Sequence, residues 1–345
     1  MPSADRSDGG DTSLTVYDMT PIGGRFVNGD RGFLIRTRCT EDGCAYELLS
    51  TVDGGQSWRA AAVPGATVVS APLDDANAVV LPGGQVVTEI QVAGDRPARH
   101  SNDRGASWPA QMAEPTGATN RVPDNAALVA FCPQSIACSE PVLRVVRPNG
   151  SSSTYGPPPP TLTETVSATR VSNGALWVQG RDGVGRVLLA ISHDEGAHWT
   201  MHRVPAPSAA SVDIVGGAKS AWALALADPD TSTTGGSGGN VSFDPNREMR
   251  QSLLYSSDSG ASFSSVKIPD AYRINKGSGI GVTQSGNAVI SAEGKVAVIS
   301  PDGTVTAITA VHGAVYDLGD RVLVFSSEGS WTSSDGETWS KLPSD

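Results

Sequence analysis

The chain has 345 residues, a net charge of −11, 39 glycines and 23 prolines. A chain of this length can bury a sizeable core, and its excess of acid argues against a nucleic-acid backbone or an anionic membrane surface as partner. No apolar run approaches the roughly 18–20 residues that a membrane-spanning helix needs.

The N-terminus is polar and acidic, which predicts a disordered tail over 1–12 and a single domain over 13–345. No signal peptide is visible at Met1. Such a start fits a cytoplasmic protein, and it equally fits a mature or lipoprotein tail whose leader has been removed. Arginine greatly outnumbers lysine, and alanine and glycine are abundant, which points to a GC-rich bacterial gene.

An octapeptide of the form Ser/Thr-x-Asp-x-Gly-x-x-Trp recurs along the chain. Apolar residues precede each copy and an aromatic residue ends it, which predicts a strand, a turn and a second strand. Internal repeats of this kind indicate a repeat architecture. The copies, the last of them shortened, are Thr51–Trp58, Ser101–Trp108, Ser192–Trp199, Ser256–Phe263 and Ser333–Trp339.

The aspartate of each copy is expected to accept hydrogen bonds from backbone N–H groups of its turn. The glycine supplies a positive φ, and the aromatic ring packs between neighbouring sheets. The alternative is metal ligation or acid catalysis, but calcium loops alternate several acids and end in Glu. Here each copy carries one Asp at a fixed place. We therefore predict structural roles for Asp53, Trp58, Asp103, Trp108, Asp194, Trp199, Asp258, Phe263, Asp335 and Trp339.

These octapeptides resemble the Asp-box (BNR) repeat of bacterial and viral sialidases. The repeat also occurs in sortilin-type receptor domains, in the photosystem II assembly propeller of plants and in some xyloglucanases. The resemblance implies a β-propeller and does not specify an activity. From here on, each octapeptide is called a box.

The box aromatics stand at 58, 108, 199, 263 and 339, and two of the gaps between them are nearly double. Degenerate copies fill those gaps, at Arg147–Ser151 before Tyr155 and at Ser300–Val305. The fold class expected is therefore all-β, a seven-bladed β-propeller of four-stranded antiparallel blades, with units of about 49 residues.

Strand positions follow from the apolar runs and turn residues. Unit three is the least regular, because Gly156–Pro160 follows its last strand. Either Thr338–Leu342 completes the seventh unit, or Leu14–Tyr17 adds an outer strand there. The expected strands are 165–172, 175–179, 186–192 and 198–204 in unit four, 279–283, 288–291, 295–300 and 304–308 in unit six, and 314–318, 321–325, 330–333 and 338–342 in unit seven.

In such a meander the box turns and the turns between first and second strands share one face, the box face. All other connections are expected on the opposite loop face, including 114–124, 228–250 and 270–277. Loops on a rigid scaffold commonly carry binding sites. For the Gly/Ser/Thr-rich insertion 228–250, neutral drift in a tolerant loop is the alternative.

Four cysteines form two local pairs, Cys39 with Cys44 and Cys132 with Cys138. Each pair flanks a turn-like loop, which favours two small disulfides and an oxidising compartment. Zinc binding and free thiols are the alternatives, but neither pair has Cys-x2-Cys spacing. The chain is therefore expected to be secreted or tethered to the cell surface, with no metal and no cofactor.

The sialidase resemblance implies a clamp of three arginines, a Tyr–Glu nucleophile pair, an Asp acid and an Arg-Ile-Pro motif. The corresponding stretch here reads Arg31–Ile35 and Arg36–Arg38, without Arg-Ile-Pro, so none of those roles is transferred. Hydrolysis of a glycoside needs two carboxyl groups about 5–10 Å apart. The weak catalytic candidates lie on the expected innermost strands, where channel water is the alternative partner: Glu164, Asp213, Tyr316 and Asp317.

Two functions remain open. The first is a non-catalytic, monomeric scaffold that binds a glycan, peptide or protein on its loop face. A Tyr-Arg-x-x-Lys cluster in an acidic protein suits an anionic or sugar ligand. The second is an Asp-box glycoside hydrolase. The candidate binding residues, which are otherwise ordinary solvated loop charges, are Arg36, Arg38, Asp42, Arg121, Tyr272, Arg273 and Lys276.

Overall fold

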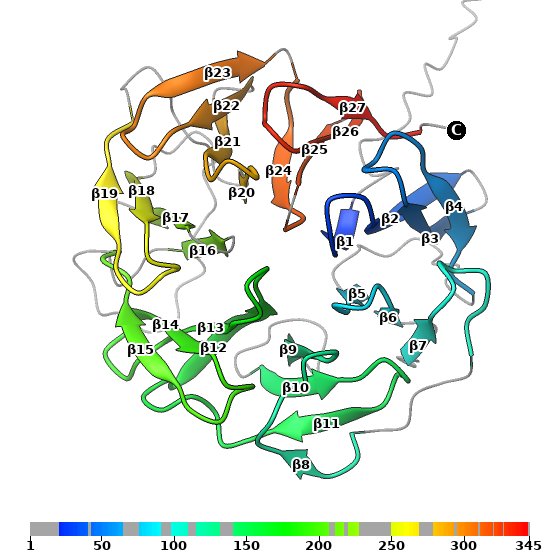
Figure 1. Cartoon of the computed structure of the whole chain (residues 1–345), viewed down its shortest axis with the longest axis horizontal. Coiled ribbons are helices and arrows are strands. Elements are labelled where there is room, and N and C mark those ends of the chain that lie inside the picture. The colour runs from blue at the N-terminus through cyan, green and yellow to red at the C-terminus, as the bar shows by residue number, and fades with distance from the viewer. Residues whose placement is uncertain are drawn as a thin grey trace, which may run out of the picture.

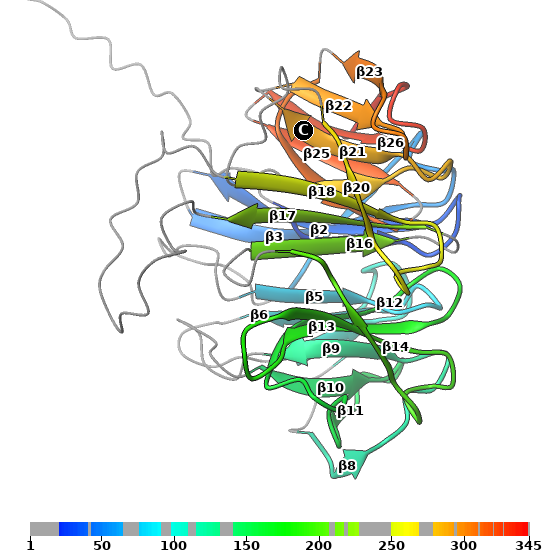
Figure 2. The same cartoon turned by 90° about the vertical axis from the view of Figure 1, so that its left-hand side faces the viewer.

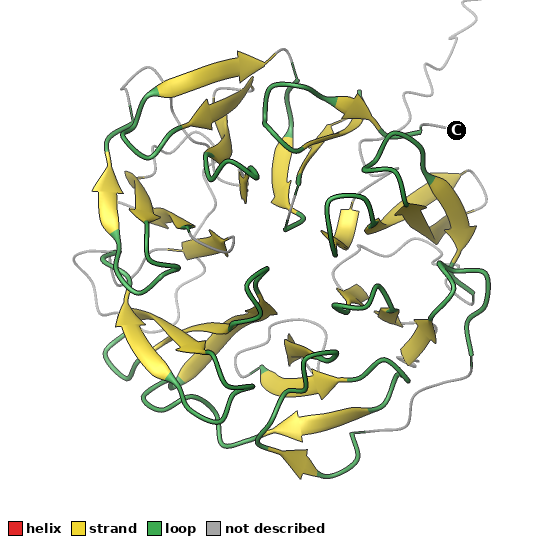
Figure 3. Cartoon of the chain, in the orientation of Figure 1, coloured by secondary structure: helices red, strands yellow, loops and turns green. Residues whose placement is uncertain are grey.

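The computed structural model describes residues 21–40, 43–64, 76–90, 98–109, 115–131, 141–206, 211–216, 220–227, 250–268, 279–292, 295–309, 311–319, 321–326 and 328–343. These residues form strands, turns and loops and no helix (Figure 3). The strands make seven small sheets around a central axis (Figure 1). The protein is a seven-bladed β-propeller, which confirms the expected fold class.

The blades, numbered in chain order, consist of the following strands from the axis outwards. Blade one has β1 (Pro21–Phe26), β2 (Gly32–Thr40), β3 (Gly43–Thr51) and β4 (Arg59–Ala62); blade two has β5 (Ala76–Val80), β6 (Val86–Ile90) and β7 (Ala98–Ser101). Blade three has β9 (Ala127–Phe131), β10 (Val142–Val146), β11 (Ser152–Tyr155) and β8 (Ala118–Thr119); blade four has β12 (Glu164–Arg170), β13 (Leu176–Arg181), β14 (Val187–Ser192) and β15 (Thr200–Arg203).

Blade five has β16 (Ser211–Gly216), β17 (Ala221–Ala227), β18 (Arg250–Ser256) and β19 (Ser264–Val266); blade six has β20 (Ile280–Val282), β21 (Ala288–Ala292), β22 (Lys295–Ile299) and β23 (Val305–Thr309). Blade seven has β24 (Ala314–Asp317), β25 (Val322–Ser326), β26 (Gly329–Ser333) and β27 (Ser340–Lys341). Every expected strand of units four, six and seven is present within a few residues of its expected bounds.

The core lies between neighbouring blades. The middle strands read as continuous apolar runs because both of their faces are covered; in β14 all six residues are buried. Trp177 of β13 packs with residues of blade five, and Trp222 of β17 packs with residues of blade six. Figure 2 shows the strands running from one face of the disc to the other, with the short turns gathered at the right-hand side.

Blade three differs from the expected four-stranded antiparallel unit. Its outermost strand, β8, comes from the segment that follows the box of blade two and pairs in parallel with β11. From there the chain crosses on the box face, where the Val122 N–H donates to the carbonyl of Glu195, 2.7 Å away in the box of blade four. As a result β9 starts at the box face, and the three inner strands β9, β10 and β11 run opposite to the strands in the same positions of the other blades.

The two degenerate copies are not boxes. In Arg147–Ser151 the first N–H donates to the fifth carbonyl and the fourth N–H to the first carbonyl, at 3.0 and 2.8 Å. The same pattern closes Ser300–Thr304 and the β12–β13 turn Val171–Ala175. These are five-residue hairpin turns with Asn or Asp in the middle. The count of seven units was right because each blade needs such hairpins, with or without a box.

Ring closure uses the chain's own last strand. β27 pairs with β26, so Thr338–Leu342 completes blade seven as one of the two expected arrangements. Phe26, Leu34 and Leu49 of blade one pack against Leu318, Leu323 and Leu342 of blade seven. The Phe26 N–H also donates to the carbonyl of Leu318 at 2.6 Å. The other candidate, Leu14–Tyr17, lies outside the described residues.

Candidate functional site

The four complete boxes share one hydrogen-bond pattern. In the box of blade four, the Ser192 hydroxyl donates to Asp194 Oδ1 at 2.8 Å and accepts from the Gly196 N–H at 2.9 Å. Asp194 Oδ1 accepts from the His198 N–H at 2.9 Å, and Asp194 Oδ2 lies 2.6 Å from His198 Nδ1. Asp53, Asp103 and Asp258 make the corresponding contacts with Ser57, Ser107 and Ser262. The carboxylates therefore bind their own turns.

These contacts set the acidity of the boxes. The Ser57 hydroxyl and N–H lower the pKa of Asp53 to about 2, and Ser107 does the same for Asp103. The Ser262 hydroxyl lowers the pKa of Asp258 to about 2, and the His198 N–H and ring hold that of Asp194 below its usual range. At Asp335 burial opposes the shift, and the Thr338 and Glu337 N–H groups still bring the pKa to about 2. All five carboxylates stay ionised near neutral pH.

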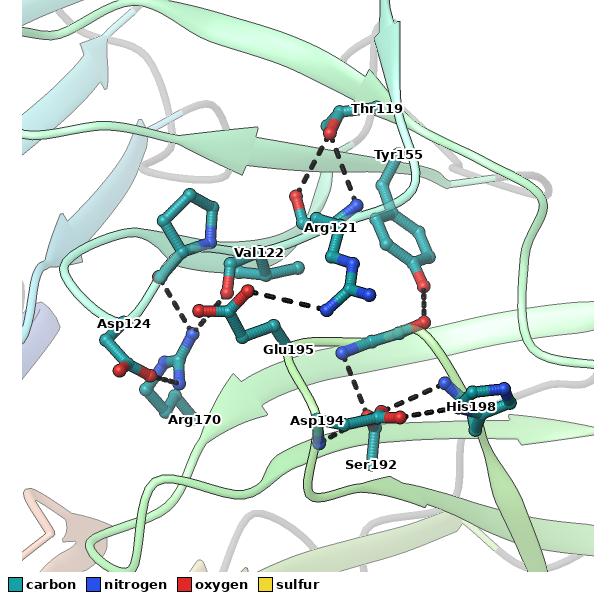
Figure 4. A network of polar contacts seen from close by, with 12 residues as sticks. Thr119, Arg121, Val122, Asp124, Tyr155, Arg170, Ser192, Asp194, Glu195 and His198 are labelled. Atoms are coloured by element: carbon teal, nitrogen blue, oxygen red, sulfur yellow. Dashed lines mark hydrogen bonds and ion pairs between the residues drawn. The ribbon is translucent and has the colours of Figure 1, made fainter.

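The polar network in Figure 4 joins blades three and four. Arg170, 6% exposed, donates through Nη2 to the carbonyls of Val122 and Pro123 at 2.8 and 2.9 Å. Its Nη1 donates to the carbonyl of Gly174 at 2.9 Å and lies 3.4 Å from Asp124 Oδ1. Burial lowers the pKa of Arg170, opposed by the charge of Asp124. Arg170 thus holds the chain segment that crosses between the two blades.

Arg121 lies in this network on the box face, so its expected place on the loop face is wrong. Its Nη1 is 3.8 Å from Glu195 Oε2 in the box of blade four (Figure 4). The reason is the reversed blade three, because the described part of the 114–124 connection crosses on the box face rather than the loop face. Nothing in the sequence around Arg121 signals that reversal.

Arg36 is the other binding candidate whose surroundings differ from the expected solvated loop. The residue is 3% exposed, and its Nε and Nη2 donate to Glu47 Oε2 at 3.2 and 3.0 Å. Its Nη1 donates to the carbonyl of Pro343 at 3.0 Å, across the ring closure. Arg36 therefore joins blade one to the C-terminal strand of blade seven.

The remaining binding candidates are placed in part or not at all. Arg38 lies in β2 opposite Ala45, and Cys39 lies opposite Cys44 at the end of the same hairpin. The pairing of these two cysteines as a disulfide stays a prediction. Outside the described residues lie Asp42, Cys132, Cys138, Tyr272, Arg273, Lys276 and the insertion 228–249.

The four weak catalytic candidates have different surroundings. Glu164, half exposed, lies 3.8 Å from Arg181 Nε. Asp317 Oδ1 accepts from the Val282 N–H at 3.2 Å and so links β24 to β20 of the neighbouring blade. Asp213 on β16 and Tyr316 on β24 reach water at the axis, and burial by the surrounding strands raises the pKa of each. The contacts of Glu164 and Asp317 are with different partners, not with each other.

The loop face of blades three and four exposes apolar side chains. Val142 at the start of β10, Val166 near the start of β12 and Val184 in the β13–β14 turn are 38%, 46% and 71% exposed. They are three of the five exposed large apolar residues of the described chain. In β10 the Arg144 guanidinium stacks on the Phe131 ring, 3.5 Å from its centroid. The sequence did not indicate this group, because single valines in short strands and turns form no recognisable exposed pattern.

Among the described residues no three His, Cys, Asp or Glu side chains gather as a metal site would require. The same part of the chain holds no helix long and apolar enough to cross a membrane.

No protein-family model matches the chain, and no curated protein matches it. Solved structures do resemble it. A prolyl endopeptidase structure has a TM-score of 0.51 at 12% identity, over 94% of this chain and 50% of that chain. The acylaminoacyl peptidase of Pyrococcus horikoshii has a TM-score of 0.51 at 10% identity, over 96% and 53%. The NanB sialidase of Streptococcus pneumoniae has a TM-score of 0.44 at 11% identity, over 91% and 67%.

This protein spans about half the length of the two peptidases. At these identities the similarity shows the propeller fold alone. A fold alone does not specify a function.

Proposed function

We propose that the chain is a non-catalytic binding scaffold that presents its loop face to a glycan, peptide or protein ligand. The observation that carries the proposal is the contrast between the two faces at blades three and four. On the box face, the box carboxylates and Arg170 form their hydrogen bonds with the backbone of the protein itself. The loop face exposes Val142, Val166 and Val184, and two residues along β10 from Val142 the Arg144 guanidinium stacks on Phe131. Exposed apolar groups next to a fixed cation are typical of recognition surfaces.

The proposal is tested with a glycan and peptide array on the purified protein, followed by Val184→Asp. Val184 is 71% exposed in a turn, so a charge there should leave the fold intact and weaken binding of a ligand that contacts this valine. The matched control is Val52→Asp, because Val52 is 52% exposed on the box face. We expect Val184→Asp to weaken the array ligand at least tenfold and Val52→Asp to leave it unchanged. If both variants weaken binding equally, the ligand does not bind on the loop face.

A second candidate function is an Asp-box glycoside hydrolase, favoured by one observation. Burial raises the pKa of Asp213, as in carboxylic acids that donate a proton during glycoside hydrolysis. This function predicts turnover of a chromogenic glycoside panel that Asp213→Asn and Asp317→Asn abolish. Ligand binding with no turnover of the whole panel favours the scaffold.

We also propose that the protein acts outside the cytoplasm, secreted or tethered at the surface. The support is the position of Cys39 directly opposite Cys44 in the β2–β3 hairpin. Cross-strand neighbours lie close enough for a disulfide. The test is alkylation of the denatured protein with and without reductant. If both cysteine pairs are disulfides, the reduced sample should carry four more alkyl groups than the unreduced one in its mass spectrum. Four alkylated cysteines in the unreduced sample would mean four free thiols, and the proposed location outside the cytoplasm would then have no support.

A further inference from the structure

Three hairpin turns on the box face contain the dipeptide Asn-Gly. They are the β1–β2 turn at Asn28–Gly29, the β10–β11 turn at Asn149–Gly150 and the β12–β13 turn at Asn173–Gly174. All three asparagines are exposed. Asparagine is a thermolabile residue, and glycine has no side chain that would hinder an attack by its backbone nitrogen. Each of these turns therefore offers the dipeptide at which deamidation is sterically easiest.

Deamidation of such a dipeptide needs no reagent other than water. At Asn173 the nitrogen of Gly174 bonds to Cγ while the Cγ–Nδ2 bond breaks, and the proton from the Gly174 N–H leaves with the ammonia. Water then opens the cyclic imide at one of its two carbonyls. One opening gives aspartate, and the other gives isoaspartate, in which the backbone runs through Cβ and Cγ.

The glycines of the three turns differ in their exposure to water. Gly174 is exposed, whereas Gly29 is half-buried and Gly150 is buried. A Cβ atom added at Gly174 would meet no atom within 4 Å. In the folded turn the Gly174 N–H donates to the carbonyl of Val171 at 2.9 Å, so the attack follows a local opening of the turn. Water and hydroxide reach the nitrogen most readily at the exposed glycine, which singles out Asn173.

The two products have different effects on the turn. An aspartate already stands in the middle of the same five-residue turn at Asp302, whose Oδ1 accepts from the Thr304 N–H at 3.0 Å. Asn173 Oδ1 accepts from the Ala175 N–H in the same way, at 2.9 Å. Aspartate at this position therefore keeps the turn. Isoaspartate moves that oxygen into the backbone and lengthens the turn, so the native hydrogen bonds cannot all form.

The turn also belongs to the polar network that joins blades three and four. Arg170 donates to the carbonyl of Gly174 at 2.9 Å, and it donates to the carbonyls of Val122 and Pro123 in the crossing segment. We propose that Asn173 is a site of spontaneous deamidation, and that its isoaspartyl product weakens these contacts of Arg170. The aspartyl product leaves them intact.

Warming the purified protein in mildly alkaline buffer tests the site itself. Peptide mass spectrometry detects the amide-to-acid mass change at each asparagine, and a protein isoaspartate methyltransferase labels the isoaspartate. We expect Asn173 to convert at least threefold faster than Asn28 and Asn149 in the folded protein. In urea all three should convert at similar rates, because the turns are then lost. Conversion of Asn173 in the folded protein no faster than that of Asn149 would overturn the assignment.

Hydrogen exchange of the Val122 amide tests the effect on the two blades. Protein warmed until most of Asn173 is isoaspartate should exchange this amide at least threefold faster than fresh protein. Asn173→Asp should match the fresh protein. Warmed Asn173→Gln protein is the control for other damage and should also match it. Unchanged exchange in the isoaspartyl protein, or equally fast exchange in Asn173→Asp, would contradict an effect through the length of the turn.

Discussion

At the scale of single residues, the box aspartates show how one side chain fixes a turn. Each Oδ1 accepts the N–H of the residue four places on, or of its equivalent in the shortened box. The serine or threonine two places earlier accepts the glycine N–H. The N–H bond to Oδ1, together with the serine or threonine hydroxyl that donates to the same carboxylate, favours the ionised form, which is why the pKa values fall.

The first prediction concerns acid stability. A carboxyl group whose pKa is lowered on folding stabilises the protein above its unfolded pKa, and that contribution disappears as the pH falls through the folded pKa. For Asp258 the window runs from about 4 down to about 2. The melting temperature of Asp258→Asn should therefore lie below that of the wild type at pH 7. The difference should shrink between pH 4 and pH 2 in a thermal scan, and a constant difference would contradict the assignment.

The second prediction concerns the buried pair Arg36–Glu47. Arg36→Met leaves the Glu47 carboxylate without its partner in a mostly buried place, which should cost about 3–5 kcal/mol of unfolding free energy. Chemical denaturation measures this loss. Arg36→Met with Glu47→Leu should recover most of it. If the double variant is as unstable as the single one, the hydrogen bond from Arg36 to Pro343 is the dominant contact.

At the scale of elements, local sequence predicted the strands well and the path between blades poorly. Apolar runs bounded by Asn-Gly or Asp-Gly gave the strands of blades four, six and seven, because those hairpins are closed by local hydrogen bonds. The reversal of blade three depends on Arg170 reaching the carbonyls of Val122 and Pro123, some 48 residues away. Such a contact leaves no periodic signal in the sequence, and for the same reason the burial of Arg36 and the place of Arg121 on the box face could not be predicted.

The third prediction concerns that crossing segment. Arg170→Met removes the donor to three backbone carbonyls in a buried network, and each buried carbonyl left without a partner should cost about 1–3 kcal/mol. The Val122 amide, which donates to Glu195, should lose protection from hydrogen exchange more than the amides of β21 in blade six. Arg121→Met is the control, since its 3.8 Å pair with Glu195 is exposed on both sides and worth about 0–1 kcal/mol. Uniform loss of protection would indicate global instability instead.

At the scale of the whole molecule, packing of blade one against blade seven closes the ring in the described part of the chain. Leu342, 3% exposed, packs in the cluster that joins blades one and seven. Because each blade is covered by its neighbours on both sides, a defect at this one interface should destabilise the whole ring.

The fourth prediction tests that closure. Leu342→Ala should lower the unfolding free energy by about 2–5 kcal/mol, the usual range for a buried leucine in a core. Urea unfolding followed by tryptophan fluorescence and by circular dichroism should still give coincident transitions. Separate transitions would show that blades one and seven open before the rest.

The direction of the inner strands of blade three has a consequence for the loop face near the axis. In the other blades the innermost strand starts at the loop face, whereas β9 of blade three ends there, at Phe131. One of the seven sectors around the axis therefore presents the C-terminal end of its innermost strand where the others present an N-terminal end. The seven blades are for that reason not equivalent at the axis, although their sheets look alike.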